Sequence, residues 1–188
     1  METPLATIGG AIRTDAFFNA GDNSRHMVVA TNGGDIYDIS YRDIGSDPSP
    51  RLVANAAIAI DIGGCFDPQD GHDPAFVATA DGSVLDISFG NSSGAPVLTT
   101  LANGIVGLTR ISAYLAEDDF FPCRIQAAAD DGRIRELRYG PHEPPIQAIN
   151  LRSDPRLDLG GFYSDDDEFR HAILLTSDGE VQELFFNP

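Results

Sequence analysis

Short hydrophobic runs alternate with polar residues along this chain, and the pattern is repeated four times. The segment 75–89, AFVATADGSVLDISF, shows it most plainly: an apolar run, a polar turn with a glycine, then an alternating run. Alternation with a period of two predicts a half-buried β-strand, and two such runs joined by a glycine turn predict a β-hairpin. The other copies span 26–41, 124–139 and 171–186.

The turn glycines recur at a nearly constant interval. They are Gly34, Gly82, Gly132 and Gly179, with spacings of 48, 50 and 47 residues. A period of this size is typical of propellers and solenoid arrays. An acid stands four residues after each glycine, and an aromatic residue stands seven after it. The acids are Asp38, Asp86, Glu136 and Glu183, and we expect them to make structural hydrogen bonds, because a catalytic group is not needed four times by symmetry.

Each hairpin is flanked by two further short strands. An upstream strand is predicted within 12–18, 60–66, 108–115 and 157–163, and a downstream strand at 51–54, 97–100 and 146–149. Paired small residues such as Gly63-Gly64 indicate close backbone approach, so the upstream strands are expected to crowd around an axis. The last unit has no downstream strand, but the N-terminal segment 5–8 is apolar and without a partner.

These elements predict an all-β fold, a four-bladed β-propeller with four antiparallel strands per blade. The N-terminal strand is expected to complete the last blade, which would close the ring and hide the sheet edges. One domain spans 1–188, with repeat units at approximately 9–55, 56–102, 103–151 and 152–188 plus 1–8. The alternative is an eight-bladed ring made by two chains, with the N-terminal strands exchanged. The small residues suit the narrow axis of a single-chain ring, which we favour.

The whole chain resembles β-propeller repeat proteins as a broad class. The Asp-Gly turn followed by a strand is similar to a WD-repeat blade, although the chain has no tryptophan and therefore no Trp-Asp dipeptide. Four blades in fewer than 200 residues resemble the hemopexin-like propeller, although Cys65 and Cys123 lie inside units two and three rather than at the chain ends. The resemblance implies the fold and no particular activity.

The upstream strands carry a charge at equivalent positions, and its sign alternates from unit to unit. If their apolar sides pack between blades, these four residues line the axial channel. We expect a ring of paired charges, because such groups are costly to bury alone. The alternative is a binding site for a polar ligand at the axis. The residues are Arg13, Asp61, Arg110 and Asp158.

Acidic residues also gather in the loops between the first and second strands of the units. Clustered carboxylates are the ligands that Ca²⁺ takes, so a calcium site is one hypothesis. Solvated hairpin tips are the other, and we favour them because the acids lack the alternating spacing of an EF-hand loop. No other cofactor is expected. The candidate metal ligands are Asp67, Asp70, Asp73, Asp165, Asp166 and Asp167.

Composition limits the partners. The net charge is −17, from 29 acids and 12 bases. Such a field repels nucleic acids and anionic membranes and favours a basic protein surface. The N-terminus has no secretory pattern, so a cytoplasmic location is expected, as a monomer or homodimer. The two cysteines occupy different repeat positions, and we expect two buried thiols rather than a disulfide.

The function expected from these features is a binding module rather than an enzyme. No zinc spacing, nucleophile elbow or phosphate-binding glycine loop is present. The main hypothesis is a propeller face that presents an acidic surface to a protein partner. The first alternative is a lectin-like propeller, in which Tyr37, Tyr41 and Tyr139 would replace the missing tryptophans in stacking on sugars. The second is a calcium-dependent enzyme or binding protein that uses the acidic loops.

Overall fold

The computed structural model of the chain is built from β-strands. It describes residues 6–21, 23–42, 48–66, 74–88, 96–116, 123–139, 146–152, 156–164, 169–176 and 179–186. Within these ranges there are fifteen strands in four antiparallel sheets. Among the same residues, no helix is long and apolar enough to cross a membrane.

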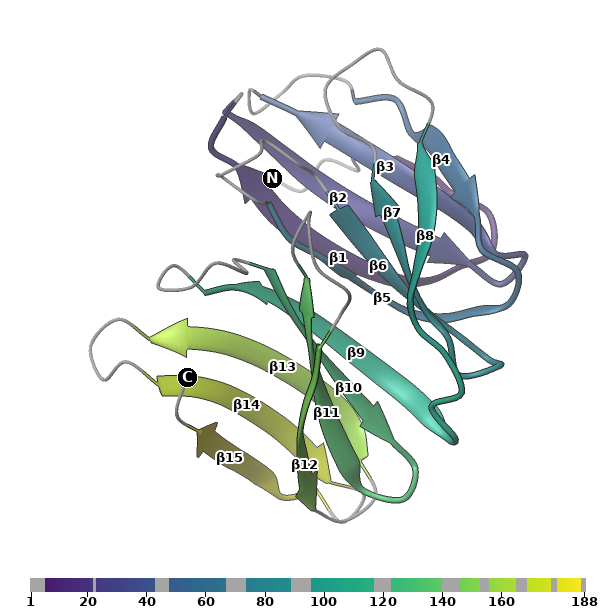
Figure 1. The fold of residues 1–188 in the computed structure, drawn as a ribbon. Helices are drawn as coiled ribbons and strands as arrows, with labels where there is room; N and C mark the ends of the chain where they lie inside the picture. Colours follow the sequence, from purple (N-terminus) through teal and green to yellow (C-terminus); the bar gives the residue numbers. More distant parts are fainter. Residues whose placement is uncertain are drawn as a thin grey trace.

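Sheets 1 and 2 form the first half of the chain (Figure 1). Sheet 1 has the strand order β1-β2-β3-β4, and sheet 2 has the order β5-β6-β7-β8. The strands of sheet 1 are β1 (Ala11–Asn19), β2 (Ser24–Thr31), β3 (Asp35–Tyr41) and β4 (Arg51–Asn55). Those of sheet 2 are β5 (Ala59–Gly64), β6 (Pro74–Thr79), β7 (Val84–Ser88) and β8 (Val97–Ala102).

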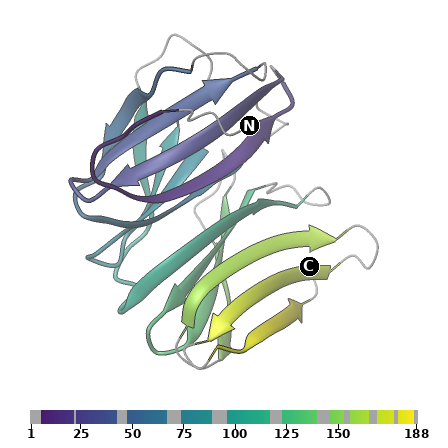
Figure 2. The same cartoon turned by 180° about the vertical axis from the view of Figure 1, so that it is seen from behind.

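Sheets 3 and 4 form the second half, seen from behind in Figure 2. Sheet 3 contains β9 (Leu108–Leu115), β10 (Cys123–Ala129), β11 (Arg133–Tyr139) and β12 (Ile146–Arg152). Sheet 4 contains β13 (Arg156–Ser164), β14 (Phe169–Thr176) and β15 (Val181–Phe186), in that order. The described part of sheet 4 therefore has three strands where the other sheets have four.

The predicted hairpins are confirmed, and their glycines have the backbone conformation that the turns need. Gly34, Gly82, Gly132 and Gly179 have φ angles of 83°, 84°, 79° and 89°. The N–H of Gly82 donates to the carbonyl of Thr79 at 2.9 Å, and equivalent bonds close the other three turns. Glycine takes positive φ without the steric cost that a Cβ brings. The repeat glycines therefore determine where each hairpin turns.

The core lies between neighbouring sheets rather than within one. Each contact joins the face of one sheet to the opposite face of the next. Phe76, Ala78 and Val84 of sheet 2, for example, form one buried cluster with Ile125, Ala127 and Leu137 of sheet 3. Separate clusters join sheet 1 to sheet 2 and sheet 3 to sheet 4. The inner strands contact one another in the order β1, β5, β9 and β13.

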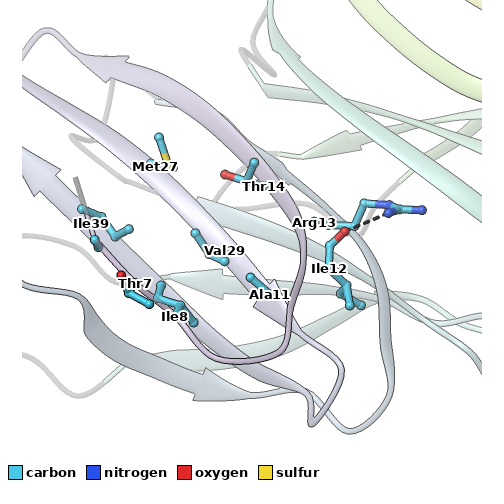
Figure 3. A pocket seen from close by; sticks show the side chains of 10 residues that line it. Thr7, Ile8, Ala11, Ile12, Arg13, Thr14, Met27, Val29 and Ile39 are labelled. Atoms are coloured by element: carbon cyan, nitrogen blue, oxygen red, sulfur yellow. Dashed lines mark hydrogen bonds between the residues drawn. The ribbon is translucent and has the colours of Figure 1, made fainter. Parts of the chain in front are cut away.

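The N-terminal segment differs from its prediction. Ala6, Thr7 and Ile8 form no strand, and no strand of the described residues adds to the edge of β15. These three residues instead line a cavity of about 840 Å³ over β1, β2 and β3, together with Met27, Val29 and Ile39 (Figure 3). Covering the apolar face of sheet 1 removes hydrocarbon from water, which pairing at an edge would not do. The closed four-bladed ring remains a prediction.

The cysteine prediction was wrong. Cys65, after β5, and Cys123, at the start of β10, form a disulfide with a Cα–Cα distance of 6.2 Å. The two positions are not equivalent within the repeat, but they face each other across the contact between sheets 2 and 3. The expected cytoplasmic location stays a prediction.

Candidate binding sites

The inner strands share a β-bulge at one place. In β1 the pairing with β2 shifts between Ala11 and Arg13, and in β5 the pairing with β6 shifts between Ala59 and Asp61. The same shift precedes Arg110 in β9 and Asp158 in β13. A bulge bends the strand and re-aims the side chains next to it. The bulges therefore set the direction of the four charged residues that the sequence singled out.

These four residues line one cavity, here called the axial cavity. It has a volume of about 370 Å³ and is bordered by all four inner strands. Arg13 Nε lies 3.5 Å from Asp61 Oδ1, and Arg110 Nε lies 3.9 Å from Asp158 Oδ1. The signs alternate from sheet to sheet, as predicted. The axial cavity is lined by Arg13, Thr14, Asp15, Asp61, Ile62, Arg110, Ile111, Ser112, Asp158 and Leu159.

Backbone N–H groups of the neighbouring inner strand bind the polar side chains of the cavity. Gly64 N–H donates to Asp15 Oδ2 at 2.8 Å, and Ile111 N–H donates to Asp61 Oδ2 at 2.9 Å. Burial raises the pKa of both carboxyls, against the lowering effect of these bonds and, for Asp61, of Arg110 and Arg13. The axial charges thus hold neighbouring sheets together, and a ligand role for them stays a prediction.

The acids that follow each turn glycine bind side chains of their own sheet. Asp38 Oδ1 lies 2.9 Å from His26 Nδ1, and Glu183 Oε1 lies 2.9 Å from His171 Nδ1. In sheet 3, Tyr114 Oη donates to Glu136 Oε2 at 3.0 Å. The histidine partners of these acids were not predicted from the sequence. The signal is the separation of twelve residues around the turn, which puts both residues on one face of a hairpin.

Ser24, His26 and Asp38 lie in the order of a hydrolytic triad. Ser24 Oγ is 2.8 Å from His26 Nε2, whose Nδ1 faces Asp38. A nucleophile has to meet its substrate, but Ser24 is only 3% exposed. The histidine–acid pair also recurs in sheet 4, where Phe169 takes the position of the serine. We therefore interpret the group as a structural hydrogen-bond network that joins β2 to β3.

A second candidate site, here called the aromatic pocket, lies at one end of sheet 1. Phe18 of β1 pairs with Arg25 of β2, and Arg25 pairs with Tyr41 of β3. Residues directly opposite each other on adjacent strands share a face, so an arginine lies between two aromatic residues. The pocket has a volume of about 510 Å³ and is lined by Ala16, Phe17, Phe18, Arg25, His26, Met27 and Tyr41.

Tyr41 is the one lectin-type tyrosine of the sequence analysis that this pocket contains. Tyr37 lies elsewhere on β3, and the side chain of Tyr139 is outside the described part. Phe18 and Arg25 were missed, because only strand pairing brings them beside Tyr41. The same register recurs in sheet 4, where Tyr163 pairs with Arg170 and Arg170 with Phe186.

The predicted calcium ligands cannot be placed. Asp67, Asp70, Asp73, Asp165, Asp166 and Asp167 all lie outside the described residues. Within the described ranges, no group of three or more His, Cys, Asp or Glu side chains is placed to hold a metal ion. The calcium hypothesis stays a prediction.

Comparison with solved structures identifies the fold class. The Aleuria aurantia lectin, as a variant in complex with α-methyl-L-fucoside, superposes with a TM-score of 0.67 at 10% identity, covering 96% of this chain and 61% of the lectin. The SapL1 lectin in complex with α-methyl fucoside gives 0.65 at 14% identity, covering 93% and 60%. The WD40 domain of SCAP from fission yeast gives 0.55 at 12% identity, covering 93% and 41%.

These likenesses show a β-propeller type of fold. The chain spans about three-fifths of the length of the two lectins. No protein family's sequence model matches the chain, and no curated protein matches it in sequence. The broad β-propeller class expected from the repeat is therefore supported, without a particular repeat type.

Proposed function

We propose that this chain is a non-enzymatic binding module that holds a neutral carbohydrate in the aromatic pocket. The observation that carries the proposal is the row of Phe18, Arg25 and Tyr41 across three paired strands. The lectin-like propeller was the alternative in the sequence analysis. Structural likeness to two propellers solved with a methyl fucoside supports moving it to the front.

The chemistry of the pocket suits a sugar better than an ion. Phe18 is 50% exposed, so its ring offers an apolar surface on which the C–H face of a pyranose can stack. Arg25 spends one N–H on the carbonyl of Arg42 at 3.0 Å. A guanidinium has five N–H donors, so others can reach sugar hydroxyl oxygens. A pocket with an apolar wall and few oriented polar groups is the usual form of a small-molecule site.

Titration calorimetry with α-methyl fucoside, followed by a glycan array, tests this function. Phe18→Ala should weaken binding by roughly tenfold, the loss expected for one aromatic contact. Arg25→Gln should weaken it further, because it removes the charged donor. Leu98→Ala is the matched control, since Leu98 is also 50% exposed but lies on sheet 2, away from the pocket. Binding of no glycan, or equal loss in the control, would refute the proposal.

A protein partner with a basic surface is the second candidate. The net charge of −17 supports it, because such a field speeds the approach of a cationic surface. One of the similar structures is the complex of the fission yeast SREBP–SCAP binding domains, with a TM-score of 0.59, 11% identity and coverage of 97% of this chain and 52% of that one. Binding to a basic protein that weakens steeply with added salt would favour this candidate over the lectin.

A further inference from the structure

The two ends of the sheet series present faces that lack a neighbouring sheet. Extensive contacts join β1 to β5, β5 to β9 and β9 to β13. No comparable contact joins β13 back to β1 in the described part of the chain. Figures 1 and 2 show sheet 1 at one end of the series and sheet 4 at the other. Sheet 4 is therefore open on one side. The opposite side of sheet 1 meets no further sheet among the described residues, but Ala6 to Ile8 lie over it.

The repeat identifies which apolar residues these open faces carry. Counted from the turn glycines, Ile173, Leu175 and Val181 of sheet 4 match the three residues by which sheet 2 contacts sheet 3. Val181 is 72% exposed, whereas its counterpart Val84 is fully buried. On sheet 1, Met27, Val29 and Ile39 match the three residues by which sheet 3 contacts sheet 2. Val29 and Ile39 are only 5% and 3% exposed, and Ala6 to Ile8 line the same surface, so docking on this face requires that segment to move aside. The two faces are thus the two halves of a contact of the sheet 2–sheet 3 type.

The hydrogen bonds between successive inner strands repeat at every second sheet-to-sheet contact. Asp15 and Ser112 accept hydrogen bonds from Gly64 N–H and Gly161 N–H of the next sheet. The contact from sheet 3 to sheet 4 therefore repeats the contact from sheet 1 to sheet 2. The next contact in the series, beyond sheet 4, should then repeat the one between sheets 2 and 3.

Sheet 4 has the groups for that contact but not its neighbour. The side chain of Asp158 is 72% exposed, whereas that of its counterpart Asp61 is 8% exposed between two arginines. Among the described residues, a Cβ on Gly160 would meet nothing within 4 Å, whereas one on its counterpart Gly63 would lie 3.0 Å from Ala113 N. A sheet that docks here therefore needs three groups. They are an arginine beside Asp158, an inner-strand N–H that donates to its carboxylate, and a small residue opposite Gly160.

We propose that a second copy of this chain supplies that neighbour, by docking its sheet 1 against sheet 4. Sheet 1 has Arg13 at the position of Arg110, Thr14 at that of Ile111 and Ala16 at that of Ala113. Each copy carries one face of each kind. Two copies therefore make two identical joints and close on each other, with sheet 4 of the partner replacing Ala6 to Ile8 on the face of sheet 1.

The joint would also bring a residue to the aromatic pocket. Cys65 bonds Cys123 across the contact between sheets 2 and 3. The counterpart of Cys65 in sheet 4 is Phe162, which pairs with His171 and is 42% exposed. The counterpart of Cys123 in sheet 1 is Arg25. Phe162 of one copy would therefore lie beside Arg25 of the other, as an aromatic ring facing a cation. The docking does not rest on the proposed carbohydrate binding and competes with it for Arg25, because Cys123, the counterpart of Arg25, is fully buried in the contact between sheets 2 and 3.

Native mass spectrometry of the whole chain over a dilution series tests the proposal. The expected mass is twice that of the 20.1 kDa chain. Val181→Arg and Asp158→Arg should each raise the dimer dissociation constant by roughly a hundredfold, because each leaves a cation without a partner in the joint. Val106→Arg is the matched control: Val106 is 84% exposed and lies outside both open faces, so the dimer should persist.

The contrary outcomes are equally clear. A monomer at every concentration would overturn the proposal and support closure within one chain. A dimer that survives Val181→Arg and Asp158→Arg as well as it survives the control would place the interface elsewhere. An assembly larger than two copies would overturn closure at two copies. Circular dichroism of each variant identifies loss of folding, and Asp158→Asn provides a milder second variant that should still weaken the dimer.

Discussion

Asp61 joins sheet 2 to both of its neighbours: its Oδ2 accepts a hydrogen bond of 2.9 Å from the N–H of Ile111, and its Oδ1 lies 3.5 Å from Arg13 Nε. One carboxylate thus links three successive inner strands. Asp61 is the axial carboxylate that has an arginine on either side, Arg13 and Arg110. This position also makes Asp61 a sensitive probe of how the inner strands are held.

The buried carboxyl of Asp61 should make stability depend on pH. Burial raises its pKa above the ordinary value of 3.8, so the folded chain holds this proton more tightly than the unfolded chain does. Stability from this group is therefore largest at low pH and declines as pH rises through the raised pKa. Compared with Asp61→Asn, the wild type should lose unfolding free energy as pH rises above the ordinary pKa of 3.8, as measured by urea unfolding.

Asp81 provides the control of opposite sign. Hydrogen bonds from Thr79 and Ser83 lower the pKa of its carboxyl, so its contribution is present above the ordinary value and is lost as pH falls. The wild type should therefore lose stability relative to Asp81→Asn on acidification. If the two comparisons change in the same direction with pH, the assignment of burial as the main influence on Asp61 is wrong.

The disulfide should contribute strongly to stability. It closes a loop with a sequence separation of 58 between sheets 2 and 3. A loop of this length corresponds to about 4 kcal/mol of restricted unfolded-chain entropy. We expect Cys65→Ala/Cys123→Ala to lower the free energy of unfolding by about that amount, measured by guanidinium unfolding.

A reducing agent separates the effect of the bond from that of the substitutions. Reduction should destabilise the wild type by a similar amount and leave the double variant unchanged. A wild type that unfolds at the same guanidinium concentration with and without reductant would show that the bond does not form in solution.

The turn glycines differ in what surrounds them, and this gives a matched pair of substitutions. Gly82 and Gly179 have φ angles of 84° and 89°, so alanine is strained at either position. A Cβ at Gly82 would also overlap the carbonyl oxygen of Ile105, whereas one at Gly179 would meet no described residue within 4 Å. Gly179→Ala should cost about 1 kcal/mol, and Gly82→Ala should cost several kcal/mol.

Thermal unfolding of the two glycine variants measures this difference. Equal losses would mean that the connection carrying Ile105 moves aside without cost. Gly104→Ala extends the comparison, since Gly104 has a positive φ of 65° and open space around it but is not a hairpin turn. It should behave like Gly179→Ala.

Several features of this protein follow from its sequence alone. The positions of Gly34, Gly82, Gly132 and Gly179 located the four hairpins, because only glycine takes their backbone angles without cost. Arg13, Asp61, Arg110 and Asp158 occupy equivalent positions of the inner strands β1, β5, β9 and β13. A repeated register places equivalent residues at equivalent points of each sheet, so these four residues line one cavity. Such local rules act within one strand or one turn, so they can be read from neighbouring residues.

Contacts between strands and between sheets were decided only by the tertiary structure. Cys65 and Cys123 sit at different repeat positions, and only the stacking of sheet 2 on sheet 3 brings their sulfur atoms together. Phe18, Arg25 and Tyr41 share no spacing in the sequence that marks them as a group. Only the pairing of β1, β2 and β3 places them side by side. Ala6 to Ile8 form no strand and line a cavity over the apolar face of sheet 1. A contact between distant segments depends on the path of the whole chain, which the composition of neither segment specifies.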